Sequence, residues 1–184
     1  MALYFTVSSF TGGASSVITL PYFKAAFPNG EYRYMLVWGM AIVGRMIGGS
    51  IHYRTKIPEK CRYAVALTVY IVISVLEGVY LFLPLALMMV CTFLNGFGGV
   101  TSYTIRISAT QSYVPDEKKG RFNGAFNMLN TVGVLAGEFL AGALTVVMPE
   151  RWVLFTFMMI CAVSAVIFIG GNAKHVAAIY NRQV

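Results

Sequence analysis

Six apolar stretches, each close to the length that crosses a bilayer, dominate the sequence. They cover about residues 2–22, 34–53, 63–83, 85–107, 122–148 and 152–171. A transmembrane helix needs about 20 mainly apolar residues, so each stretch is long enough to span. Only 11% of the 184 residues are charged, whereas a soluble domain has roughly 25%. The sequence therefore predicts an all-α membrane protein of six transmembrane helices, followed by a tail over residues 172–184.

Positive charges lie in the connections between the stretches, and they predict the orientation of the chain. One side carries three basic residues, whereas the other carries those of the second–third connection, the fourth–fifth connection and the tail. These residues are Lys24, Arg33 and Arg151 on the first side, and Arg54, Lys56, Lys60, Arg62, Lys118, Lys119, Arg121, Lys174 and Arg182 on the second. Because short cytoplasmic loops are rich in Lys and Arg, we expect a multi-pass protein of the cell membrane with both termini in the cytoplasm. The net charge of +7 then needs no nucleic-acid partner.

Small and polar residues interrupt the first and fourth stretches at their centres. The first contains Gly12 and Gly13 among serines and threonines, and the fourth contains Asn95, Gly96 and Gly99. Glycine costs a helix about 1 kcal/mol relative to alanine, and hydrocarbon cannot satisfy an asparagine amide. We therefore expect both helices to be broken near mid-membrane beside a cavity. The alternative is that the glycines only allow close helix packing.

The two interrupted stretches open two groups of three spans. A unit with an odd number of spans is inverted relative to the next unit, so the pattern predicts two inverted three-helix repeats. Interrupted helices at corresponding positions of such repeats are the best sequence indication of a transporter site. The substrate-binding candidates are Ser9, Thr11, Gly12, Gly13, Asn95, Gly96, Gly99, Tyr103, Asn127 and Asn130.

The fifth stretch combines a polar face with a face of small residues. Asparagines, Glu138 and Thr145 recur at helical spacing, and Gly133, Gly137 and Ala141 run beside them. A seam of small residues predicts tight packing on a neighbouring helix. The polar face then contacts either water or a partner, although a single asparagine more often bonds a neighbouring helix.

Four ionisable residues fall within the stretches. A charged group at mid-membrane costs at least about 2.5–3.5 kcal/mol, so such residues mark functional sites by default. Glu138 is the first candidate for a proton-coupling carboxylate, and Glu77 is the second. For Arg45 and Arg106 we favour a structural role, pairing with Asp116 or Glu117. Together with Arg54 and Arg121, these residues would form a cytoplasmic latch.

Two motifs resemble the carboxy-terminal half of a major facilitator superfamily transporter. The segment from Gly44 to Lys56 resembles the degenerate second copy of that superfamily's loop signature, a glycine followed by an acid and basic residues. The connection from Arg106 to Gly124 resembles its V-P-x-E-x-R-G-x-x-x-G motif. Tyr53 stands where the loop signature usually has aspartate, which puts an acid–base gating pair there in doubt. The resemblance implies that the first and fourth spans line a path between two six-helix bundles.

The resemblance implies one half of a secondary active transporter, which moves a small solute by alternating access. The second six-helix bundle would be an amino-terminal half or a second copy of this chain, and the lipid bilayer would surround both. A membrane assembly or scaffold subunit, acting as a homodimer without transport of its own, is the alternative. No nucleophile–base pair, H-E-x-x-H helix or phosphate-binding loop indicates an enzyme. The three cysteines and two histidines have no metal-binding or disulfide spacing, so neither a metal nor a cofactor is predicted.

Overall fold

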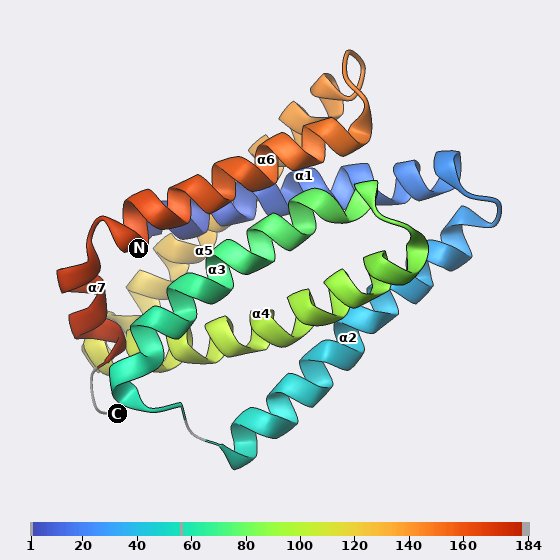
Figure 1. Cartoon of the computed structure of the whole chain (residues 1–184). Helices are drawn as coiled ribbons and strands as arrows, with labels where there is room; N and C mark the ends of the chain where they lie inside the picture. Colours follow the sequence, from blue (N-terminus) through green and yellow to red (C-terminus); the bar gives the residue numbers. More distant parts are fainter. Residues whose placement is uncertain (1, 56, 182–184) are drawn as a thin grey trace.

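The chain is an all-α bundle in the computed structural model, which describes residues 2–55 and 57–181, with the backbone alone over 108–113. The seven α-helices of the described residues are α1 (Ala2–Ala26), α2 (Gly30–Arg54), α3 (Arg62–Val79), α4 (Leu85–Tyr113), α5 (Asp116–Leu144), α6 (Glu150–Ser164) and α7 (Ala173–Tyr180). Short turns of helix η1 (Glu59–Cys61), η2 (Tyr80–Phe82) and η3 (Ala165–Gly170) extend α3 and α6. Figure 1 shows α1, α5 and α6 gathered on one side and α2 with α4 on the other.

The expected breaks in the first and fourth helices are wrong. Both α1 and α4 are continuous α-helices through Gly12–Gly13 and through Asn95–Gly99. Proline does not end α1 either, because Pro21 lies inside it. The glycines remain helical because several of them face a neighbouring backbone, where packing offsets their poor helix propensity.

Two helix pairs, α1 with α5 and α2 with α4, pack most closely in the bundle. A Cβ atom added to Gly13 would collide with the carbonyl oxygen of Val134, and one added to Gly137 would collide with that of Phe10. In the other pair, a Cβ on Gly96 would meet the carbonyl of Ala41, and a Cβ on Gly44 would meet that of Phe93. In each pair, both helices therefore contribute a glycine in backbone-to-backbone contact, and Gly133 adds a further such contact between α5 and α1.

Helices α3 and α6 pack on each other and on both pairs. One apolar cluster includes Ile18, Met88 and Leu154, and a second includes Ala66, Ala165 and Ile169. Both prolines at the starts of α5 and α6, Pro115 and Pro149, precede the first helical residue, where a missing N–H costs little. The core of the bundle thus consists of two apolar clusters.

The predicted tail contains the helix α7, which packs on α3 and α4. The hydroxyl groups of Tyr70 and Tyr180 lie 3.2 Å apart, and the Tyr63 backbone N–H donates to Asn181 Oδ1 at 3.1 Å. Ala2 and Val176 line one hollow, so the two ends of the described chain meet at the same end of the bundle (Figure 1).

Four helical segments of the described chain are long and apolar enough to cross a membrane. They are Gly30–Arg54, Glu59–Phe82, Leu85–Ile107 and Glu150–Gly170. The two other long helices, α1 and α5, carry the serine- and asparagine-rich faces noted in the sequence, which lower their hydropathy. These two less apolar helices pack closely on each other.

Overpacking a glycine at a helix crossing should destabilise the bundle, whereas the same change at an open position of the same helix should not. A Cβ at Gly137 meets the Phe10 backbone, but a Cβ at Gly142 meets nothing within 4 Å. We expect Gly137→Val to lower the free energy of unfolding in detergent by about 1–3 kcal/mol or more. Gly142→Val, the matched control, should leave it nearly unchanged. Equal stability of the two variants would contradict the interlocked α1–α5 pair.

Candidate functional site

A polar cavity of about 370 Å³ opens between the helices near the middle of the bundle. Its polar and charged lining comes from five helices and comprises Tyr4, Ser8, Ser9, Thr11, Arg45, Tyr70, Ser74, Glu77, Asn95, Ser102, Tyr103, Arg106 and Asn130. Gly12 and Gly99 line it too, and neither has an atom of another segment within 4 Å of where its Cβ would lie. The glycines therefore have two roles. Gly13 and Gly96 pack on a neighbouring helix, whereas Gly12 and Gly99 leave room in the cavity.

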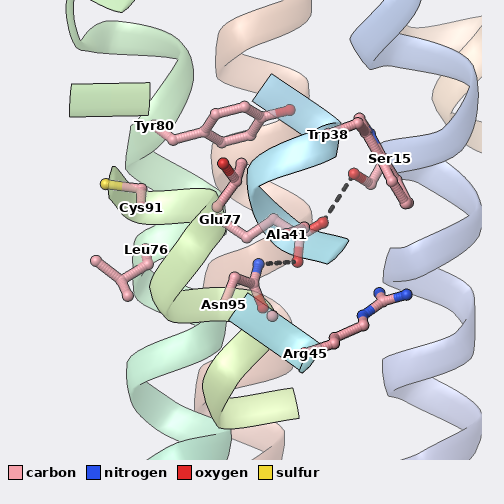
Figure 2. Close-up of a pocket in the computed structure, with 11 residues that line it drawn as sticks. Ser15, Trp38, Ala41, Arg45, Leu76, Glu77, Tyr80, Cys91 and Asn95 are labelled. Carbon is pink, nitrogen blue, oxygen red and sulfur yellow. Dashed lines mark hydrogen bonds between the residues drawn. The ribbon is translucent and has the colours of Figure 1, made fainter. Parts of the chain in front are cut away.

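Glu77 of α3 ties α1 to α4 beside this cavity. Its two carboxylate oxygens accept hydrogen bonds from the Ser15 hydroxyl at 2.8 Å and from the Asn95 amide at 3.1 Å, which Figure 2 shows as dashed lines. A smaller cavity of about 110 Å³, which Arg45 also lines, adjoins all three residues. Hydrogen bonds to a charged group are among the stronger ones, at about 1.5–3 kcal/mol. Glu77 therefore connects α1 and α4, the two helices that we expected to line the transport path.

Arg45 projects from the middle of α2 and lines both cavities. In Figure 2 its side chain lies at the lower edge of the group and points away from Asn95. Within the part of the chain that the structure describes, its guanidinium group has no ion pair, hydrogen bond or ring contact. An exposed hollow beyond it is lined by Met46, Ser50 and Tyr53. The arginine is thus the charged group of the cavity that its own chain leaves least satisfied.

Arg106 of α4 lies among aromatic rings at the other side of the cavity. Its guanidinium carbon is 4.8 Å from the centre of the Phe5 ring, and 5.3 Å from the centres of the Tyr103 and Phe126 rings. Such cation–π contacts strengthen when water is excluded. This arrangement links α4 to α1 and α5 through one side chain.

Asn130 lines the cavity and carries an unpaired acceptor. Its Oδ1 atom is buried and receives no hydrogen bond from the described residues. A buried amide oxygen without a donor costs about 1–3 kcal/mol.

Most of the predicted substrate-binding residues lie around this one cavity, and three do not line it. Ser9, Thr11, Gly12, Asn95, Gly99, Tyr103 and Asn130 line the cavity. Gly13 and Gly96 lie at the helix crossings, although Gly96 also borders the small cavity. Asn127 is exposed on α5 and lies outside the cavity lining.

The predicted cytoplasmic latch has a different arrangement from the expected one. Asp116 forms an ion pair with Lys119 of the same helix, at 2.5 Å. The hydrogen bond and charge of Lys119 hold the pKa of Asp116 below its ordinary value. Glu117 and Arg121 are exposed on α5, and Arg54 borders the hollow beside Arg45.

Of the two candidate carboxylates, Glu77 has more hydrogen bonds to neighbouring helices than Glu138. Glu138 is half-buried on α5, with its Oε1 atom 3.2 Å from the Ser16 hydroxyl of α1. It does not line the polar cavity, whereas Glu77 does.

Sequence reasoning missed Ser15 and Ser102 as partners of the site. Their signal was helical spacing, because each falls one turn after a predicted residue, Ser15 after Thr11 and Ser102 after Gly99.

Comparison with known proteins identifies the class of this chain. The model of the Major Facilitator Superfamily matches residues 59–175, more than half of the sequence. The chain therefore belongs to the major facilitator superfamily, as its two motifs suggested. No curated protein and no solved structure matches it. The superfamily consists of secondary transporters and not of enzymes, so this chain is a multi-pass membrane protein that contacts lipid and a solute.

Removing the Glu77 carboxylate should loosen α1 from α4. We expect Glu77→Ala to lower the free energy of unfolding by about 1.5–3 kcal/mol, because two hydrogen bonds to a charged group are lost. Glu138→Ala is the matched control and should cost less, since Glu138 has one long contact at a more open position. Ser15→Ala should have no further effect once Glu77 is gone. Additive losses in a double-mutant cycle would show that the two residues do not interact.

Proposed function

We propose that this chain is the carboxy-terminal half of a secondary active transporter that moves a small solute by alternating access. The observation that carries the proposal is the polar cavity that α1 and α4 share with α3, close to Glu77. Lipid tails offer no partners for its serines, asparagines and arginines, so a cavity of this chemistry needs water or a polar solute. The carboxy-terminal assignment rests on the two motifs quoted above.

The contacts of the glycines support two inverted repeats, with α1–α3 matching α4–α6. Phe10 and Gly13 of α1 lie the same number of residues before Phe93 and Gly96 of α4. Ala41 and Gly44 of α2 likewise precede Val134 and Gly137 of α5 by one common spacing. In both crossings the glycine meets the partner's backbone at the matched position. Such a repeat requires six spans, which adds α1 and α5 to the four helices of sufficient hydropathy.

A second six-helix bundle completes the transporter in this proposal. It is either an amino-terminal half or a second copy of this chain. A polar residue that is exposed along a membrane segment, Asn127 on α5, supports a partner there. Rocking of the two bundles would open the cavity to each side in turn.

The proposed orientation places both termini in the cytoplasm of a cell-membrane protein. The excess of Lys and Arg in the second–third and fourth–fifth connections supports it. The two ends of the described chain lie at one end of the bundle, which agrees with an even number of crossings. In this orientation α7 lies on the cytoplasmic side.

Alternating access predicts that a cavity position reacts with a charged thiol reagent from either side of the membrane. In a background without Cys61, Cys91 and Cys161, we expect Gly99→Cys to be modified by a membrane-impermeant methanethiosulfonate in both right-side-out and inside-out vesicles. Leu140→Cys is the control, because Leu140 is an exposed apolar residue of α5 that lipid would cover. Reaction of Gly99→Cys from neither side would contradict the transport path and favour an assembly subunit.

Proton coupling, if it resides at the candidate carboxylates, should make this reactivity depend on pH. We expect the modification rate of Gly99→Cys to change with pH, and Glu138→Gln or Glu77→Gln to abolish the change, because neither amide can titrate. The pH dependence of the reagent itself is subtracted with a small free thiol. A dependence that survives both substitutions would remove both residues as coupling sites.

A further inference from the structure

We propose that the solute carries a carboxylate group and that Arg45 binds it. This inference rests on the proposed transport function and adds the chemical class of the substrate. It starts from Arg45, an exposed residue of α2 that lines the open polar cavity and has no partner among the described residues. A guanidinium group inside a membrane segment is costly unless an anion or a polar group compensates it.

The repeat shows why Arg45 has room for a ligand. Arg45 directly follows Gly44, and its repeat-equivalent Glu138 directly follows Gly137. Glu138 meets the hydroxyl of Ser16. The position equivalent to Ser16 is Gly99, which has no side chain and no neighbouring atom within 4 Å of its missing Cβ. Where one repeat supplies a partner for the charged residue, the other leaves space in the cavity.

The charge of the cavity favours an anion over a cation. Its lining contains two arginines, Arg45 and Arg106, and a single acidic residue, Glu77. The Glu77 oxygens already accept hydrogen bonds from Ser15 and Asn95. A single negative charge on the solute would balance the lining, and a carboxylate matches the two-pronged geometry of a guanidinium group.

The solute also has to be small. The cavity volume of about 370 Å³ lies at the lower end of the range for ligand pockets. A small carboxylate therefore fits both the volume and the charge of the cavity.

Binding of propionate, with propionamide as the uncharged analogue, tests the inference. We would insert the full chain with Trp152→Phe into lipid nanodiscs, so that Trp38, which lines the small cavity with Arg45, is the sole tryptophan reporter. We expect propionate to bind with saturation and propionamide to bind more weakly. Arg45→Gln should weaken propionate binding by about ten- to a hundredfold, the loss of a charge-assisted hydrogen bond. Arg45→Lys should have an intermediate affinity for propionate, because lysine keeps the charge but cannot donate two parallel hydrogen bonds as a guanidinium group does.

Arg33→Gln is the matched control, since Arg33 lies on the same helix and lines neither cavity; it should bind propionate like the parent. Equal binding of propionate and propionamide, or parental binding by Arg45→Gln, would overturn the inference. So would dissociation of a dimer by Arg45→Gln in a chain that binds no propionate, because Arg45 would then pair with a second copy. If cysteine modification from both sides persists in that case, the transporter stands and only the carboxylate class fails.

Discussion

The close approach of helix backbones at four glycines is the constraint on which the bundle depends. Hydrophobic burial cannot hold helices together in lipid, because the tails are as apolar as the side chains, so contact between backbones has to do so. Gly13 and Gly137 join α1 to α5, and Gly44 and Gly96 join α2 to α4. Other positions of α1 and α4, among them Gly12 and Gly99, line the polar cavity.

Rigid pairs also determine what can move. Within each pair, sliding would force one backbone into another, so movement is easier between the pairs than within them. Polar contacts connect α1 to α4 in addition to the apolar clusters: Glu77 accepts from Ser15 and Asn95, and Arg106 lies over rings of α1, α4 and α5. Hydrogen bonds and cation–π contacts can exchange partners with water or a solute, which interlocked glycines cannot. In the proposed transport mechanism, the site would therefore lie where the helices can move relative to one another.

Sequence periodicity was enough to find the long helices, because apolar length and charged connections are local properties. It also found the small-residue seam of α5 at Gly133, Gly137 and Ala141, all of which are buried. It could not tell a glycine that breaks a helix from one that packs on a neighbour, since Gly12 and Gly13 differ only in the direction they face. The importance of Glu77 was equally hidden, because its partners Ser15 and Asn95 are distant in sequence. The position of Glu138 nearer mid-membrane had made it the first candidate from sequence.

The two proposed repeats share their crossing glycines but differ in the charged residues that follow them. The four crossing glycines occupy equivalent places in the two proposed repeats, and the residues that follow Gly44 and Gly137 have opposite charges. Selection for packing acts on the glycines alike, because both crossings have the same geometry. The next positions are free to differ, since they point away from the crossing. Arg45, which has no partner among the described residues, and Glu138, which lies beside Ser16, would give the two proposed repeats different chemistry on a similar backbone.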